Sequence, residues 1–200
     1  PQKWDKIDKA LVSLKENHLF RTMKTIESAQ SSHVTIDGKD YVLMASNNYL
    51  DIASHPSIKS AVVESTAMYG FGSGGSRLTT GNTVIHNALE NKIASYKETE
   101  AAIVFNTGYV ANVATISVMV KKGDTVFSDE LNHASIIDGC RLSKAKIVTY
   151  AHNDMDDLRK KIQENPCETG IVVSDAVFSM DGDILKFPEF LDICEENQLF

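Results

Sequence analysis

Short apolar segments alternate with longer mixed segments along the second half of the chain. Four apolar runs have the length and composition of buried strands: residues 101–105, 125–127, 146–150 and 171–173. The segments that follow them are predicted to be helices: residues 109–120, 134–142, 155–163 and 188–197. Strands that alternate with helices predict an α/β fold, in which helices cover both faces of a mainly parallel sheet.

The first hundred residues follow a different pattern. An opening helix is predicted from apolar residues spaced three or four apart, at Trp4, Ile7, Leu11 and Leu14. Two short strands, residues 34–36 and 41–44, flank the dipeptide Asp37-Gly38 and predict a hairpin. Two more helices are predicted over residues 56–69, where Pro56 suits a first turn, and residues 82–97.

Composition excludes several classes of protein. The 200 residues are 42 % hydrophobic, which argues against a disordered chain. Twenty Lys and Arg against 27 Asp and Glu give a net charge of −7, so no basic surface for nucleic acid is expected. The apolar runs are too short to span a membrane, and no leader pattern opens the chain, so a cytoplasmic protein is predicted.

The three cysteines favour neither disulfides nor zinc. Cys140, Cys167 and Cys194 are widely spaced, and no C-x-x-C pattern occurs. We therefore predict three reduced thiols and no metal site.

The last residues continue the alternation of helices and strands. Residues 198–200 follow a predicted helix and resemble the start of a further buried strand, which predicts that the chain is the N-terminal part of a longer protein.

Residues 70–75 contain the pattern G-x-G-x-x-G, which in another context would indicate a dinucleotide site. That site requires a strand before the glycines and a helix directly after them. Here a helix is predicted before the loop, and residues 76–81 separate it from the next helix. We therefore reject the dinucleotide fold. The loop is either a flexible connection or a place where the backbone approaches a ligand or a partner chain.

A predicted strand-to-helix junction lies at residues 105–109. The backbone N–H groups of Gly108 and Tyr109 open the helix, at the edge of the sheet where ligands of open α/β folds bind. They can hold a phosphate group. The spacing of these residues alone favours the alternative, a plain turn between a strand and a helix.

Two further polar loops follow predicted strands at the same edge. Residues 129–135 contain His133, which can act as a base, a stacking partner or a metal ligand, although no second ligand stands at the usual spacing. Residues 174–183 bring acids and serines. Three polar loops at one sheet edge predict a single site for an anionic cofactor.

Four motifs in order resemble the α-oxoamine synthases, which are pyridoxal-phosphate enzymes that join an amino acid to an acyl thioester with loss of carbon dioxide. The motifs are SNNYL at 46–50, GSGGSR at 72–77, NHASIIDG at 132–139 and VFSMDG at 177–182. The resemblance implies an aspartate-aminotransferase-like fold truncated at the C-terminus, and a homodimer. It places residues 1–45 in a small domain and residues 46–200 in the first part of the large cofactor-binding domain.

The same resemblance implies roles for five residues. Gly108 and Tyr109 match the backbone pair that binds the phosphate of pyridoxal phosphate. His133 matches the ring that stacks on the cofactor and contacts the substrate. Ser179 matches the hydroxyl near the phenolic oxygen of the cofactor. Arg21 matches the residue that contacts the acyl substrate, although an arginine after a helix can simply complement the helix dipole.

Residues 74–82 and 108–112 most resemble family members that condense L-alanine with a pimeloyl thioester. The guanidinium fork of Arg21 suits the distal carboxylate of that substrate. The thiol carrier, coenzyme A or a carrier protein, stays open. The nearest alternative is condensation of glycine with acetyl-CoA on the same fold. A different class of function, an inactive binding or dimerisation fragment, also stays open.

The chain departs from the family pattern in three respects. Asp51 stands where the family commonly has glycine, so this turn is expected to differ. Asp175 stands at a position that varies among family members, between an acid and its substitutes, so its role is left open. The lysine that forms the Schiff base, and the aspartate that pairs with the pyridine nitrogen, are expected beyond residue 200, because none of the lysines here has the family context.

Overall fold

The residues that the computed structural model describes, 3–200, divide into two units. The first unit ends at Ser76 and the second is Arg77–Phe200. The boundary expected after residue 45 concerns the domains of a complete enzyme and stays a prediction. No helix among the described residues has the length and apolar character needed to cross a membrane.

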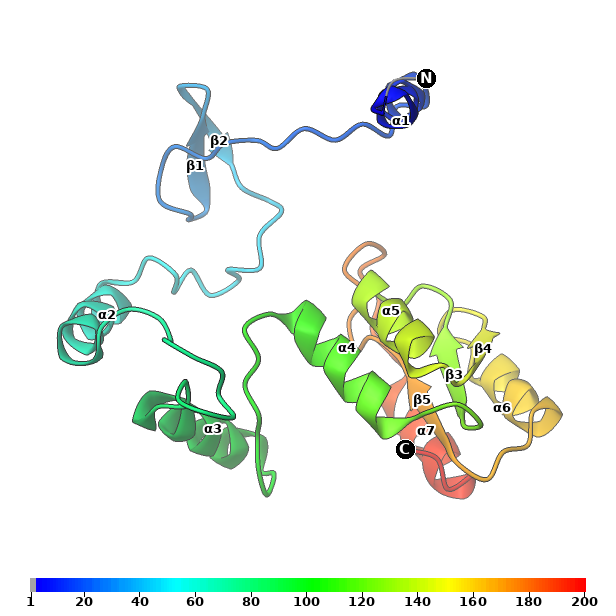
Figure 1. The fold of residues 1–200 in the computed structure, drawn as a ribbon. Helices are drawn as coiled ribbons and strands as arrows, with labels where there is room; N and C mark the ends of the chain where they lie inside the picture. Colours follow the sequence, from blue (N-terminus) through cyan, green and yellow to red (C-terminus); the bar gives the residue numbers. More distant parts are fainter. Residues whose placement is uncertain (1–2) are drawn as a thin grey trace. The chain divides into compact units, whose positions relative to one another are not determined.

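A parallel sheet forms the centre of the second unit (Figure 1). Its strands are β3 (Thr125–Asp129), β4 (Lys146–Tyr150) and β5 (Gly170–Val173), in the order β4-β3-β5. β3 pairs with both neighbours, so all five of its residues are buried. The predicted parallel sheet is therefore confirmed.

Residue 200 continues the sheet on the open side of β5. The Val172 N–H donates to the Phe200 carbonyl at 2.7 Å, and the Phe200 N–H donates to the Gly170 carbonyl at 3.3 Å. In a parallel ladder, the N–H and the carbonyl of one residue bond to two residues that lie two positions apart on the neighbouring strand, as Phe200 does here with Gly170 and Val172. The predicted start of another strand thus lies where a fourth strand would pair.

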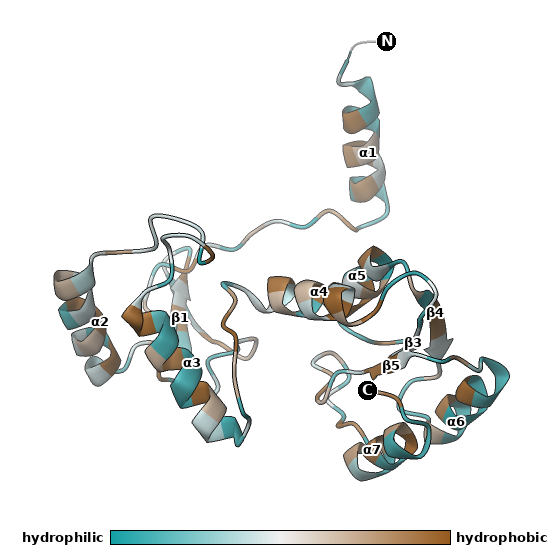
Figure 2. Ribbon diagram, turned by 60° about the horizontal axis from the view of Figure 1, so that its bottom comes forward, coloured by the Kyte–Doolittle hydropathy of each residue, from teal (hydrophilic) through white to brown (hydrophobic). Residues whose placement is uncertain are grey.

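Four helices cover the sheet, two on each face. α4 (Gly108–Met119) and α5 (Ala134–Ser143) pack against one another, and α6 (Met155–Glu164) and α7 (Phe187–Glu196) form the second pair (Figure 1). Figure 2 shows both hydrophilic and hydrophobic positions along α6 and α7. Such amphipathic helices bury one side on a sheet and expose the other.

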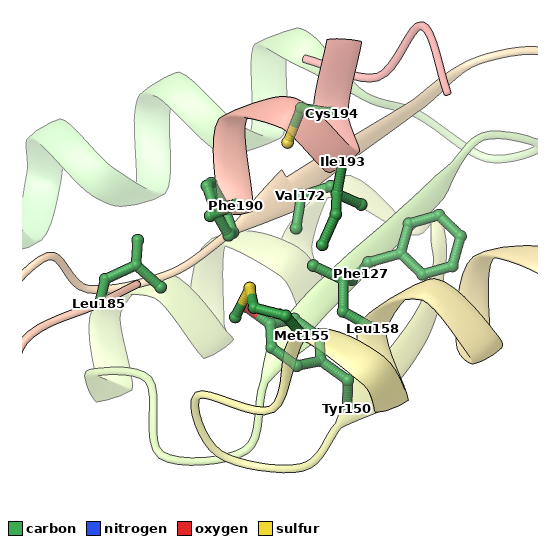
Figure 3. Close-up of a cluster of buried hydrophobic side chains, with 9 residues drawn as sticks. All are labelled: Phe127, Tyr150, Met155, Leu158, Val172, Leu185, Phe190, Ile193 and Cys194. Atoms are coloured by element: carbon green, nitrogen blue, oxygen red, sulfur yellow. The ribbon is translucent and has the colours of Figure 1, made fainter. Parts of the chain in front are cut away.

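The alternation of side chains along β3 divides the core in two. Val126 faces α4 and α5, in a cluster with Ile116, Val120, Ile136, Cys140 and Ile171. The next residue, Phe127, faces α6 and α7 (Figure 3), in a cluster with Tyr150, Met155, Leu158, Val172, Leu185, Phe190, Ile193 and Cys194. All three cysteines are free thiols, and burial raises the pKa of Cys140 and Cys194.

The strand expected at residues 101–105 does not form, so this prediction was wrong. A strand is held by pairing with another strand, and this segment pairs with none of the described strands. Side chains form hydrogen bonds with its backbone groups instead. The Val104 N–H donates to Glu90 of α3 (Val84–Lys97) at 2.8 Å, and Arg77 donates to the Val104 carbonyl at 3.0 Å.

Arg77 and Glu90 form the ion pair that organises this segment. Their side chains are joined by two hydrogen bonds of 2.7 and 3.0 Å. The bond from Arg77, followed by the bond from the Val104 N–H, lowers the pKa of Glu90 to about 2. The pair therefore stays ionised across the physiological range.

The first unit contains α1 (Asp5–Glu16), a hairpin of β1 (His33–Ile36) and β2 (Lys39–Val42), and α2 (Pro56–Tyr69). The hairpin turns at Asp37 and Gly38, whose φ angles of 51° and 68° are both positive, as in a type I′ turn. The hairpin and the bounds of α2 are confirmed, while β2 begins two residues earlier than predicted. Neither helix buries a residue within this unit.

Asp51 keeps a backbone conformation that glycine adopts more easily. Its φ angle is 50°, in the left-handed region. The carboxylate accepts hydrogen bonds from Asn48 at 3.2 Å and from Ser31 at 3.0 Å. These bonds offset the cost of the positive φ, so the turn tolerates aspartate at this position.

Close packing of α4 on α5 depends on Gly139. A Cβ atom at this residue would lie 3.1 Å from the Ile116 Cβ and 3.2 Å from the Asn112 carbonyl oxygen. We expect Gly139→Ala to lower the free energy of unfolding of the full-length protein by about 1–3 kcal/mol, because the two helices must move apart. Gly108→Ala is the matched control, since a Cβ there meets no atom within 4 Å. Chemical denaturation measures both, and equal stability of the two variants would contradict the packing role.

Candidate active site

Asn132 joins the loops that follow β3 and β5. Its side-chain amide donates to the Ser128 hydroxyl at 3.0 Å and to the Val173 carbonyl at 2.9 Å. Its side-chain oxygen accepts from the Asp175 N–H at 2.8 Å. Asn132 is buried, so these three bonds are formed away from water and hold the two loops in one arrangement.

Asp175 supplies a second link between the same loops. Its carboxylate accepts a hydrogen bond from the His133 N–H at 2.7 Å. The sequence left the role of Asp175 open and assigned none to Asn132. The available signal was a polar residue soon after a buried strand, but only the fold shows that the two residues meet.

His133 caps the N-terminus of α5. The ring Nδ1 accepts from the Ser135 N–H at 3.2 Å and lies 2.7 Å from the Ser135 hydroxyl. A nitrogen that accepts from a backbone N–H carries no proton, so this network assigns the proton of the neutral ring to Nε2. The side chain is otherwise exposed, which leaves the ring face and Nε2 free for a ligand.

Ser135 connects this cap to the neighbouring helix. It is fully buried, and its hydroxyl accepts from the Asn112 side chain of α4 at 2.9 Å. The hydroxyl proton is then directed toward His133 Nδ1. The orientation of the imidazole is therefore set by both helices.

A pocket of about 270 Å³ lies between the two loops. The loop after β3 contributes Leu131, Asn132, His133 and Ala134, and the loop after β5 contributes Asp175, Val177, Phe178, Ser179, Met180 and Asp181. Two of the predicted site residues, His133 and Ser179, thus lie in one pocket. The structure brings them together from segments that are distant in sequence.

Gly108 and Tyr109 lie at the N-terminus of α4 and do not line this pocket. Thr107 caps the helix by accepting from the Val110 N–H at 3.1 Å. The first two amides of the helix, those of Gly108 and Tyr109, have no acceptor among the described residues. Because a Cβ at Gly108 would meet no atom within 4 Å, there is open space beside these amides.

The phenol of Tyr109 is held by α5. It donates to the Asp138 carboxylate at 2.8 Å, and this bond raises the pKa of Tyr109. Arg21, in contrast, lies in the first unit, after α1, with an exposed side chain. Its role in binding a substrate stays a prediction. Among the described residues, no cluster of three His, Cys, Asp or Glu side chains has a metal-binding arrangement.

Comparison with known proteins gives a consistent result. Residues 39–200 match the family of aminotransferases class I and II. The chain is 48 % identical to 8-amino-7-oxononanoate synthase of Geotalea daltonii over 93 % of its length, and 47 % identical to that of Lysinibacillus sphaericus over 98 %. It spans 48 % and 51 % of these relatives, or about half their length.

Solved structures show the same partial coverage. A serine palmitoyltransferase from S. paucimobilis with a bound PLP-myriocin aldimine is 32 % identical, with a TM-score of 0.89 over 99 % of this chain and 50 % of that one. An 8-amino-7-oxononanoate synthase from Francisella tularensis is 31 % identical, with a TM-score of 0.63 over 74 % of this chain and 41 % of that one. The predicted aspartate-aminotransferase-like fold is confirmed for the part of these enzymes that the chain spans.

The cap at α5 predicts a difference between two variants of His133. His133→Ala removes the acceptor for the Ser135 N–H and should lower the free energy of unfolding by about 1 kcal/mol. His133→Asn supplies another capping acceptor and should restore most of that loss. Thermal or chemical unfolding of the full-length variants measures this, and equal losses would mean that the cap contributes nothing.

Proposed function

The chain belongs to the aminotransferase class I and II family, and we propose on this basis that the full-length protein is a pyridoxal-phosphate-dependent acyltransferase. It condenses L-alanine with a pimeloyl thioester and releases carbon dioxide, which yields 8-amino-7-oxononanoate for biotin biosynthesis. The observation that carries the proposal is the pocket shared by His133 and Ser179 at the carboxyl ends of the strands. Relatives named 8-amino-7-oxononanoate synthase support this choice of reaction.

The residues present fit pyridoxal phosphate. The unpaired amides of Gly108 and Tyr109, at the positive end of a helix dipole, suit its phosphate. The exposed face of His133 suits stacking on the pyridine ring, and the Ser179 hydroxyl suits a hydrogen bond to the phenolic oxygen. When bound, the cofactor supplies an electron sink for the carbanion of the amino acid.

The protein side chains orient the reactants. Fixed by Ser135 at Nδ1, the His133 ring presents an Nε2–H donor toward the pocket. That donor can bind a carboxylate of the amino acid substrate while Ser135 keeps the orientation of the ring unchanged. The bonds of Asn132 and Asp175 hold the His133 loop against the start of the loop that carries Ser179, which favours one productive geometry.

The remaining parts of the site are proposed from the family. The Schiff-base lysine is placed in the sequence that the relatives have beyond the region matched here. The enzyme is a homodimer, and Arg21 binds the distal carboxylate of the pimeloyl chain. The cytoplasmic location also stays a prediction.

The two His133 variants test the role of the ring. Both His133→Ala and His133→Asn lose the stacking surface, so both should reduce turnover strongly, while only the alanine variant loses the cap. Steady-state kinetics of the full-length variants, with melting temperatures alongside, separate the two effects. Full turnover in a stable His133→Asn variant would exclude stacking by this ring.

Gly108→Val tests the phosphate site. The valine side chain fills the space beside the first two amides of α4, so we expect cofactor affinity to fall about ten- to a hundred-fold, as for loss of a charge-assisted hydrogen bond. Absorbance titration with pyridoxal phosphate measures the affinity. Gly108→Ala should have a smaller effect. Wild-type affinity in the valine variant would place the phosphate elsewhere.

Arg21→Ala tests the choice of acyl substrate. If the guanidinium pairs with the distal carboxylate, the variant should raise KM for pimeloyl thioester about ten- to a hundred-fold and leave KM for L-alanine nearly unchanged. Assays of the wild type with glycine and acetyl-CoA distinguish the alternative reaction. An unchanged KM for the pimeloyl substrate, or preference for the acetyl substrate, would contradict the proposed specificity.

A further inference from the structure

Behind the pocket, His152 lies between two carboxylates. It follows β4, and its ring Nδ1 is 3.0 Å from Asp129 Oδ1 at the end of β3. Its Nε2 is 2.8 Å from Asp183 Oδ2, in the loop after β5. The ring therefore connects segments that follow or end all three strands of the sheet.

The loop that Asp183 belongs to is the one that carries Ser179. Within it, the Gly182 N–H donates to the Phe178 carbonyl at 2.7 Å, and the Phe178 N–H donates to the Asp183 carbonyl at 3.0 Å. Val177 and Ile184 also form an antiparallel bridge. These bonds make residues 177–184 a closed turn, so the position of Asp183 determines the position of Ser179.

A ring contact adds to the ionic contacts. The Phe178 ring meets the His152 ring edge-on, with centroids 4.4 Å apart and planes at 81°. Phe178 is buried, and it directly precedes Ser179. A perpendicular arrangement of two aromatic rings in contact is favourable, so this contact also holds the loop against His152.

Asp129, the carboxylate on the sheet side of His152, is held rigidly. Asp129 is fully buried, and its two oxygens also accept from the backbone N–H groups of Leu131 and Asn153, each at 2.8 Å. Asn153 contacts the loop as well, since its side chain donates to Asp183 at 3.3 Å and to the Ile184 carbonyl at 3.0 Å. The sheet end thus provides a fixed point to which the loop is attached.

We propose that His152, held between Asp129 and Asp183, is a positioning residue that fixes the Ser179 side of the pocket by clamping the loop 177–184 to the end of β3. The proposal rests on the proposed function in one respect only, namely that the pocket binds pyridoxal phosphate. The clamp itself is defined by contacts among the described residues.

The protonation state of His152 controls this clamp. A neutral imidazole has one N–H and can donate to only one carboxylate, whereas the imidazolium donates to both. The other ionisable groups bonded to this segment are also acidic: Glu130 accepts from the His152 N–H and Asp157 from the Ala151 N–H. Hydrogen bonding to Asp129 first, and to Asp183 as well, raises the pKa of His152 against the opposing effect of burial.

The sign of the pH dependence follows from this shift. Because the pKa is higher in the folded protein than in the unfolded chain, the stabilisation is complete below the ordinary histidine value of about 6.5. It is lost as the pH rises through the folded-state pKa. We therefore expect the loop 177–184 to be held firmly at mildly acidic pH and more weakly once the pH has risen through the folded-state pKa of His152.

Two measurements on the full-length protein test the clamp without any substrate. Proton NMR of the histidine rings gives the pKa of His152, and hydrogen exchange with mass spectrometry gives the protection of residues 177–184. We expect the pKa to exceed the ordinary value. We expect exchange in the loop, corrected for the intrinsic rate, to rise about ten- to a hundred-fold as His152 loses its proton.

Three variants sharpen the test. His152→Gln carries no positive charge, so the loop should exchange faster than in the wild type at mildly acidic pH, where the wild-type imidazolium bonds both carboxylates, and the affinity for pyridoxal phosphate should fall there. Asp183→Asn lets a neutral imidazole donate to Asp129 and accept from the new amide, at the cost of the 3.3 Å bond from Asn153. This variant should keep the loop protected and remove its pH dependence. His18→Gln, at an exposed histidine of the first unit, is the control.

The outcomes separate the clamp from the enzymatic proposal. An ordinary pKa for His152, or a loop in His152→Gln that exchanges at mildly acidic pH as in the wild type, would overturn the clamp whatever reaction the enzyme catalyses. Should His152→Gln fail to fold, a pH-dependent loop in Asp183→Asn would overturn it equally. Absence of cofactor binding or condensation in the wild type would instead contradict the proposed function and leave both clamp measurements unaffected.

Discussion

The structure of the site depends on the need to hydrogen-bond the polar groups at the buried end of β3. This strand has neighbours on both sides and helices on both faces, so its last residues are out of contact with water. Buried polar groups without partners are costly, and here the partners come from the loop that follows β3 itself and the loop that follows the neighbouring strand β4. Ser128 is bonded by Asn132, while Asp129 is bonded by His152 and the backbone of Asn153. The bonds that satisfy the end of the strand therefore also fix the loops around the pocket.

Two histidines near the pocket have opposite electrostatic surroundings. His133 accepts from a backbone N–H at the N-terminus of α5, so its Nδ1 faces a hydrogen-bond donor. His152 faces carboxylates at both nitrogens, which suits a positive ring. His133 lines the pocket, and His152 contacts Asp183 in the loop that carries Ser179. The different roles proposed for the two rings, binding for His133 and positioning for His152, follow from these different neighbours.

Helix N-termini provide the polar part of the site and also hold it together. In α5 the cap is His133, so a residue proposed to touch the cofactor also stabilises its helix. In α4 the cap is Thr107, which occupies the third amide of the helix and leaves the first two without an acceptor. The packing of these helices through Gly139 and through the Asn112–Ser135 bond keeps both N-termini in one arrangement. The residues that stabilise these helix ends are therefore next to, or the same as, those proposed to bind the cofactor.

The sequence by itself determined most of the local structure. The turn at Asp37-Gly38, the helix that begins at Pro56 and the strand at residues 146–150 follow from nearest neighbours and from apolar periodicity, which act over a few residues. The motifs also identified His133 and Ser179. Only the tertiary structure decided the rest. Residues 101–105 have the composition of a strand but lack a partner in the described chain, because pairing depends on residues elsewhere. The Asn132–Asp175 link and the His152 clamp join residues up to 43 positions apart, and no local pattern encodes which of many polar residues will meet at the end of a sheet.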